Sequence, residues 1–104
     1  SGRPFHLIAG ILANKDAAGI LKPFAARQTT VHAVPVPAHA HHDPTELVAI
    51  AAAEGLNGMA AASAIDALDW IGRHADRTSP PVVLILGSLY LAGAVLAENG
   101  PLPD

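Results

Sequence analysis

A cation and a carboxylate stand side by side in the turn Gly10-Ile11-Leu12-Ala13-Asn14-Lys15-Asp16. An apolar run precedes this turn and a helical pattern follows it, so Lys15 offers a mobile positive charge beside a helix N-terminus, where backbone amides already favour an anion. The pattern therefore predicts that Lys15 binds a carboxylate or a phosphate. The structural alternative is a solvated Lys15 beside an Asp16 that only caps the helix.

A second turn, Gly87-Ser88-Leu89-Tyr90-Leu91-Ala92-Gly93, follows the apolar run 82–86. Gly87 allows the backbone to approach a ligand closely, and the Ser88 hydroxyl both donates and accepts hydrogen bonds. The structural alternative is a tight turn in which Ser88 caps the last helix. Because ligands of open α/β sheets bind beyond the carboxyl ends of the strands, both turns are candidates for a binding site. Neither turn carries a nucleotide fingerprint such as G-x-G-x-x-G, which argues against a complete nucleotide site.

The most conspicuous polar cluster is His39-Ala40-His41-His42-Asp43. In an extended loop His39 and His41 would project to the same side, and neutral imidazoles are good ligands for zinc or nickel. No second ligand pair lies at a familiar spacing, so His39, His41 and His42 are weak metal candidates and adventitious binding is favoured. The histidines at positions 6, 32 and 74 fall within expected strands and a helix, where we expect structural roles.

Composition excludes several classes of function. The chain has 104 residues, 51% of them hydrophobic, and a formal net charge of −3. Its six Lys and Arg residues are scattered, whereas a nucleic-acid interface needs a clustered basic face, so we expect no nucleic-acid partner. The absence of cysteine excludes disulfides, thiolate zinc sites and thiol nucleophiles, and it fits a cytoplasmic protein.

One uncharged stretch, from Pro80 to Ala97, is nearly as long as a membrane helix. Its first half, residues 82–86, is rich in β-branched residues, and Gly87-Ser88 then interrupts the run. This pattern predicts a buried strand, a turn and a helix, and we expect no membrane partner. A membrane-associated fragment would require the whole stretch to be helical.

The elements that must position these residues alternate along the chain. Apolar runs predict strands over 5–9, 30–34 and 82–86, with a weaker one over 59–62. Helical patterns follow Asp16, with Pro23 kinking or splitting the first helix. Others begin after Asp43 and Ser63 and cover 89–96, and the helix after Ser63 is expected to face inward with Ile65, Leu68, Ile71 and Gly72.

This alternation predicts an α/β fold: a three-layer, Rossmann-like, mostly parallel sheet with helices on both faces. We expect a single domain over residues 1–104, with residues 98–104 as a tail.

The run from His6 to Asp16, taken with the turn from Gly87 to Gly93, resembles the C-terminal domain of bacterial bifunctional folylpolyglutamate synthase/dihydrofolate synthase, in the Mur ligase family. Two motifs carry the resemblance, G-x-L-x-x-K-D and G-S-L-Y-L-x-G, and they coincide with the two turns described above. The similarity extends from about Arg3 to Leu96, almost the whole chain.

The resemblance implies an ATP-dependent ligase that adds L-glutamate to dihydropteroate or folates. Such an enzyme phosphorylates the acceptor carboxylate, because a carboxylate oxygen is a poor leaving group, and the glutamate amine then attacks the acyl phosphate. By this resemblance Lys15 would pair with a glutamate carboxylate, Ser88 would hydrogen-bond glutamate, and Tyr90 would line the site. The positions that would support the two loops are Gly10, Asp16 and Gly87.

The resemblance also implies what lies elsewhere. In the family, ATP and Mg²⁺ are bound mainly by the N-terminal domain, which carries the phosphate loop, and the pterin substrate is bound mainly there as well. This chain also lacks the family's first strand with its D-G-A-H-N-P motif. We therefore expect the fragment alone to have no ligase activity, and we expect an exposed strand edge through which it can dimerise.

The alternative hypothesis is a free-standing α/β binding module. Such a module would use the His39–His42 loop to hold a metal ion or a protein partner.

Overall fold

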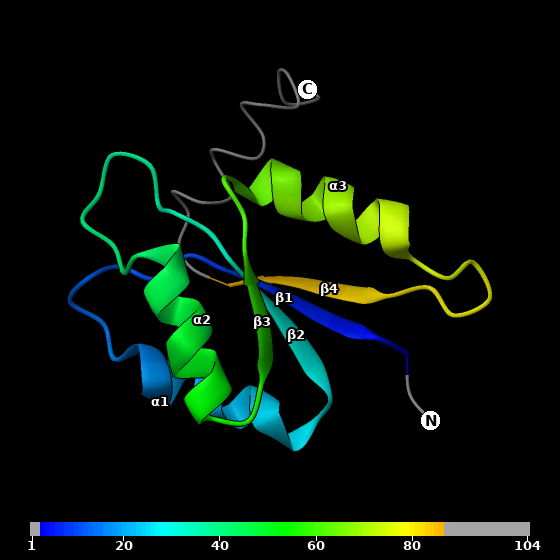
Figure 1. Ribbon diagram of the computed structural model, residues 1–104, viewed down its shortest axis with the longest axis horizontal. Helices are drawn as coiled ribbons and strands as arrows, with labels where there is room; N and C mark the ends of the chain where they lie inside the picture. The colour runs from blue at the N-terminus through cyan, green and yellow to red at the C-terminus, as the bar shows by residue number, and fades with distance from the viewer. Residues whose placement is uncertain (1–2, 87–104) are drawn as a thin grey trace, which may run out of the picture.

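The computed structural model describes residues 3–86, which form an α/β fold with helices on both sides of a parallel sheet (Figure 1). The strands are β1 (Phe5–Ala9), β2 (Thr29–Ala33), β3 (Asn57–Ala60) and β4 (Val82–Leu86). The helical segments are α1 (Ala17–Leu21), the 3-10 helix η1 (Lys22–Ala26), α2 (Pro44–Ala53) and α3 (Ala64–His74). The predicted fold class is confirmed.

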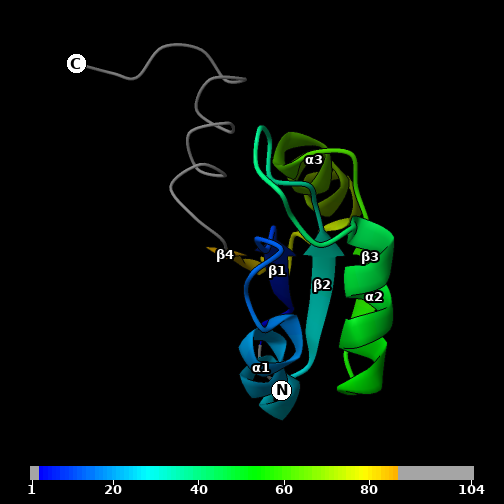
Figure 2. The ribbon, with the colours of Figure 1, turned by 90° about the vertical axis from the view of Figure 1, so that its left-hand side faces the viewer.

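The sheet has the order β3-β2-β1-β4, and every neighbouring pair is parallel. The chain adds β2 and β3 on one side of β1 and then returns to place β4 on the other side. Figures 1 and 2 show α1 and α2 on one face of the sheet and α3 on the opposite face. The direction of strand addition therefore reverses between β1 and β4. In open α/β sheets, ligands bind beyond the carboxyl ends of the strands at such a point.

Local sequence signals set the helix ends. Asp16, Asp43 and Ser63 cap the three α-helices, accepting hydrogen bonds from the backbone N–H groups of Gly19, Thr45 and Asp66 respectively. Pro23 ends α1 early, because a proline has no N–H to continue the helical ladder, and the chain continues as η1.

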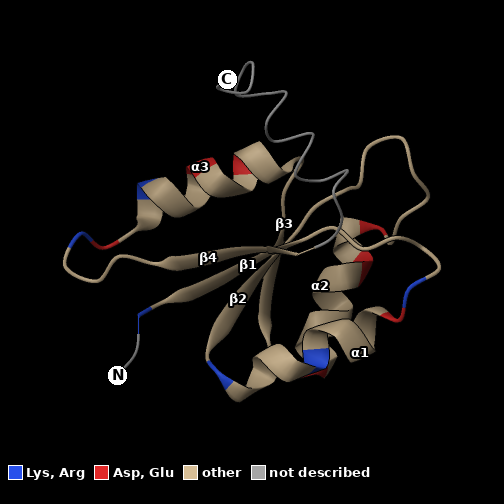
Figure 3. Cartoon of the chain, turned by 180° about the vertical axis from the view of Figure 1, so that it is seen from behind, with Lys and Arg blue, Asp and Glu red and all other residues tan. Residues whose placement is uncertain are grey.

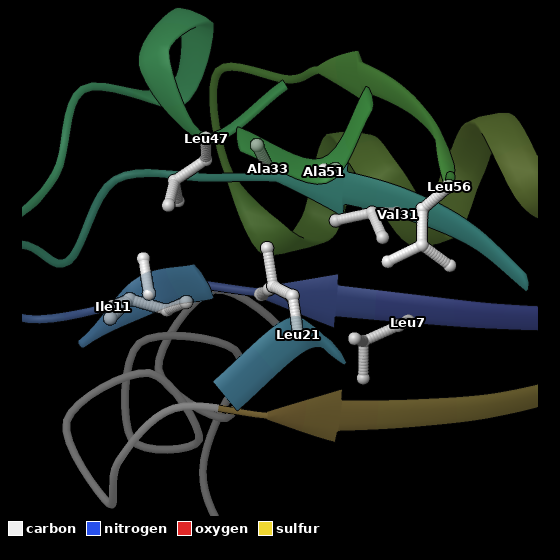
Figure 4. Close-up of a cluster of buried hydrophobic side chains, with 10 residues drawn as sticks. Leu7, Ile11, Leu21, Val31, Ala33, Leu47, Ala51 and Leu56 are labelled. Carbon is white, nitrogen blue, oxygen red and sulfur yellow. The ribbon is translucent and has the colours of Figure 1, made fainter. Parts of the chain in front are cut away.

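The main core lies between β1, β2, α1 and α2 and consists of aliphatic side chains (Figure 4). Its fully buried members include Leu7, Leu21, Val31 and Leu47. A smaller cluster on the opposite face packs α3 against the sheet through Ile8, Val34, Ala64, Ala67 and Ile71.

Several predicted details differ from the structure. The buried residues of α3 are Ala64, Ala67 and Ile71, so the buried face begins one residue before the predicted Ile65. Gly72, which was predicted to face inward, is exposed. The β2 and β3 strands begin at Thr29 and Asn57, earlier than predicted.

The β4 strand forms as predicted, but among the described strands it lies at an edge of the sheet. Leu84 and Ile85 are 41% and 39% exposed, so the expectation of a buried strand is wrong for residues 3–86. A dimer through this edge stays a prediction. The predicted helix over 89–96 and the tail lie outside the described residues.

Residues 82–86 form a strand, so the interpretation of Pro80–Ala97 as one continuous membrane helix is wrong. Within residues 3–86, none of the helices combines the length and the apolar character needed to cross a bilayer.

Candidate functional site

The loop that carries Lys15 leaves the carboxyl end of β1 and leads into α1. Its backbone turns tightly, with Lys15 N–H donating to the Leu12 carbonyl at 3.0 Å. Lys15 is exposed, and within residues 3–86 it forms no ion pair. The ammonium is therefore available to an anionic ligand. Because α1 has only five residues, the attraction must come from this charge and not from a long helix dipole.

Asp16 fixes the end of this loop. Its Oδ1 accepts the Gly19 N–H at 3.1 Å, so the carboxylate is engaged in capping and does not form a salt bridge with Lys15. Gly19 is required by this geometry, because a Cβ at this position would collide with the Asp16 carboxylate. Asp16 therefore serves as the helix cap that the sequence predicts.

Gly10 joins the Lys15 loop to the sheet. Its N–H donates to the Leu86 carbonyl at 3.2 Å, so the carboxyl ends of β1 and β4 are held together. A Cβ on Gly10 would lie 3.0 Å from Val36 Cγ2, tighter than an ordinary contact. The absence of a side chain thus allows the segment after β2 to pack closely on the start of the loop.

The loop that follows β2, residues 34–43, packs against the Lys15 loop. Figures 1 and 2 show both loops on the same side of the molecule, beyond the carboxyl ends of the strands. Ala13 N–H donates to the Ala40 carbonyl at 3.0 Å, and His42 N–H donates to the Ile11 carbonyl at 2.9 Å. Leu12 and His41 form an antiparallel bridge between the two segments.

The His42 side chain adds a third connection. Its Nε2 lies 2.9 Å from the Lys15 carbonyl oxygen, and because a carbonyl only accepts, this nitrogen donates. The Nδ1 of the same ring lies 3.7 Å from Glu46 Oε1, one turn into α2. His42 therefore holds the main chain of Lys15 and leaves the ammonium free, a role that the sequence alone does not reveal.

The histidine cluster is thus a structural part of the loop pair. His41 Nδ1 donates to the His39 carbonyl at 2.7 Å, and His42 Nε2 donates to Lys15 as described. Within residues 3–86, no three His, Cys, Asp or Glu side chains are arranged to hold a metal ion. The metal form of the alternative hypothesis therefore has no site in the described part of the chain.

Asp43 follows the cluster and begins α2. Hydrogen bonds from the hydroxyl and the backbone N–H of Thr45, at 2.7 and 2.9 Å, lower the pKa of its carboxyl group. Asp43 therefore stays ionised as a cap, and α2 begins at a fixed distance from the Lys15 loop.

The second predicted turn follows β4 directly. Leu86 is the last described residue, and Gly87, Ser88 and Tyr90 lie outside the described residues. The structure places the end of β4 beside Gly10.

On the face covered by α3, two strand histidines form a pair in which His32 is buried and His6 is half-buried. His6 Nδ1 lies 2.9 Å from His32 Nε2, and His32 is only 1% exposed. Burial lowers the pKa of His6, while burial and the nearby His6 charge lower the pKa of His32 to about 4. The Trp70 ring lies 5.4 Å from His32 and stacks on His74 at 3.9 Å, and His74 Nδ1 donates to the Trp70 carbonyl. These three histidines have the structural partners expected of them.

No protein-family model matches the chain, and a search of the curated proteins gives no match. Two solved structures of folylpolyglutamate synthase from Mycobacterium tuberculosis are similar to it, each with a TM-score of 0.79. One is described as complexed with ADP and AMPPCP and the other with ADP. The fold is that of a part of folylpolyglutamate synthase.

The similarity covers 100% and 99% of this chain, at 22% and 21% sequence identity. The chain spans 25% of the length of each folylpolyglutamate synthase structure. At this identity the comparison establishes the architecture, and it agrees with the resemblance carried by the two sequence motifs.

Proposed function

We propose that this chain is the glutamate-binding, C-terminal domain of an ATP-dependent ligase that adds L-glutamate to dihydropteroate or folates. The observation that carries the proposal is the position of the Lys15 loop, at the point where the strand order reverses between β1 and β4. In α/β sheets this point is where ligands bind. The fold shared with folylpolyglutamate synthase supports the proposal independently.

Under this proposal each turn has a distinct role. The Lys15 ammonium neutralises a glutamate carboxylate, the Ser88 hydroxyl donates a hydrogen bond to the same amino acid, and Tyr90 lines the site. Gly10 and Gly87 allow the two turns to approach the ligand closely. Holding glutamate by its carboxylates leaves its amine positioned for attack on an acyl phosphate.

The remaining chemistry belongs to other parts of the ligase. ATP supplies the phosphoryl group that makes the acceptor carboxyl group reactive, and Mg²⁺ neutralises the phosphate charge. We propose that both, like dihydropteroate or folate, bind mainly to an N-terminal domain outside this chain, in a cytoplasmic enzyme. This chain by itself is then inactive, and it shows no glutamate-dependent ATP hydrolysis in a phosphate-release assay. Measurable turnover by the 104-residue chain would contradict this part of the proposal.

Glutamate binding is tested by titrating the ¹⁵N-labelled chain with L-glutamate and following amide shifts. We expect saturable shifts in residues 10–16, and about tenfold weaker binding in Lys15→Met, since loss of one charge-assisted contact costs about 1.4 kcal/mol. Ser88→Ala weakens binding less, because it removes a neutral donor. The matched control is Lys22→Met, which removes an exposed lysine on η1 and leaves the affinity unchanged.

Two results would overturn the assignment. One is a Lys15→Met variant that binds glutamate as tightly as the parent chain, and the other is an equal loss in Lys22→Met. L-Glutamine serves as a ligand control, because it lacks the side-chain carboxylate.

A further inference from the structure

A cavity lies at the amino ends of β1, β2 and β3, at the opposite end of the strands from the Lys15 loop. Its volume is about 480 Å³, within the range of small-molecule sites. The polar residues that line it include Arg3, His6, Arg27, Gln28, Thr30 and Asn57. Among residues 3–86, no aspartate or glutamate lines it.

The cavity concentrates positive charge in a chain whose formal net charge is −3. Two of the chain's arginines, Arg3 and Arg27, line it, and within residues 3–86 neither of them forms a salt bridge. Figure 3 shows the basic segments at the start of β1 and just before β2 with no acidic segment between them in the described part of the chain. The described part of the chain therefore supplies no carboxylate to neutralise this charge.

Uncharged partners hold both guanidinium groups in place. Arg3 donates from Nε to the Pro80 carbonyl at 2.8 Å and from Nη2 to the Pro81 carbonyl at 3.4 Å. The Arg27 guanidinium lies 4.4 Å from the centroid of the Phe5 ring, a cation–π contact that leaves its N–H groups available. Each guanidinium has five N–H donors, so donors remain for an oxyanion.

His6 adds a group whose charge can respond to a ligand. Its Nδ1 is hydrogen-bonded to the buried ring of His32, so its Nε2 is the ring nitrogen not used in that bond. Among residues 3–86, the charged or titratable groups beside His6 are Arg3 and Arg27 in the cavity and His32 on β2. Its β4 neighbour, Val83, is apolar, and α3 places the uncharged Trp70 ring against His32, with His74 stacked on that ring. Burial lowers the pKa of His6, so its charged form is unfavourable until an anion enters beside it.

We propose that this cavity binds a small anionic molecule through a phosphate or a carboxylate group. Arg3, Arg27 and His6 hold the oxygen atoms of this group, and His6 takes up one proton from solvent on binding. The resulting imidazolium donates from Nδ1 to His32 Nε2 and from Nε2 to the anion. The site does not involve Lys15, so it stands or falls independently of the glutamate proposal.

The test titrates the ¹⁵N-labelled chain with sulfate, which keeps the same charge over the pH range used, and separately with citrate. We expect saturable shifts at the amino ends of β1, β2 and β3 and none in residues 10–16. Arg27→Gln and, as a second variant, Arg3→Gln weaken binding about tenfold. The matched control is Arg77→Gln, which removes an exposed arginine outside the cavity and leaves the affinity unchanged.

The two probes also distinguish the ligand class. Tighter sulfate binding assigns a phosphate-type group, and tighter citrate binding assigns a carboxylate. Equal weakening by Arg77→Gln, or shifts that do not saturate with either probe, would show only general charge screening and overturn the proposal.

Proton uptake is measured by calorimetry of sulfate binding to the parent chain in two buffers of different ionisation enthalpy. We expect uptake of up to one proton, and tighter sulfate binding at about pH 6 than at about pH 7.5, with the difference lost in His6→Gln. Binding without proton uptake would exclude the role of His6.

Discussion

The two faces of the sheet are built from different chemistry. The face covered by α1 and α2 buries an aliphatic cluster, in which Leu7, Leu21 and Leu47 have no exposed surface. The face covered by α3 buries the imidazole of His32, hydrogen-bonded to His6 and lying against Trp70. The stability of the first face depends on shape and buried apolar area, while the stability of the second also depends on the protonation state of a buried ring.

This difference has a functional consequence. The Lys15 loop leads into α1, which is fixed on the aliphatic face through Ala17 and Leu21. Its position depends on this apolar packing and on the hydrogen bond from His42 to the Lys15 carbonyl. The His6 ring instead reaches from the second face into the cavity at the amino ends of the strands, where an anion can alter its charge.

The largest expected effect comes from the aliphatic face. Leu47→Ala removes a fully buried side chain between α2 and the sheet and should lower the free energy of unfolding by about 3 kcal/mol, from lost burial and the resulting cavity. Leu68→Ala on α3 is the comparison, since Leu68 is only partly buried against the smaller cluster and should cost about 1 kcal/mol. Urea denaturation measures both, and equal losses would remove the distinction between the two faces.

The second-largest expected effect is a loss of stability at acid pH that originates at the α3 face. The folded-state pKa of His32, about 4, lies below the unfolded value of 6.5, so the unfolded chain binds the proton more readily. Stability is therefore fully present above pH 6.5 and is lost as the pH falls towards 4, by about 3 kcal/mol in total.

The His32→Leu variant tests this assignment, because it fills the site with an apolar side chain that does not titrate. Its free energy of unfolding should fall much less between pH 6.5 and 4 than that of the parent chain. His39→Gln, which replaces an exposed histidine away from the α3 face, is the matched control. Parallel curves for the parent and His32→Leu would assign the acid sensitivity to other groups.

Local sequence signals account for most of the fold. The β1 strand, the split at Pro23 and the three caps follow from short-range rules that act within a few residues. The edge position of β4 among the described strands was missed, because a β-branched run has the same pattern in central and edge strands.

The candidate site was only partly predictable. The Lys15 loop was located from its residue types, but its contact with His42 joins positions 27 residues apart and leaves no periodic trace in the sequence. For the same reason the histidine cluster was interpreted as a weak metal candidate, whereas the imidazoles of His41 and His42 donate to main-chain carbonyls. The charged cavity also escaped sequence analysis, because Arg3 and Arg27 are brought together only by the pairing of β1 with β2.

The smallest expected effect compares two helix caps, one on each face. Asp16→Ala on α1 and Ser63→Ala on α3 each remove one side-chain acceptor of a backbone N–H and should each cost about 1 kcal/mol. Only Asp16→Ala should speed hydrogen exchange at the Gly19 amide, whose acceptor it removes beside the Lys15 loop. An unchanged exchange rate at Gly19 in Asp16→Ala would mean that the cap contributes nothing to positioning Lys15. The Lys15 loop would then be held only by its hydrogen bonds to Ala40 and His42.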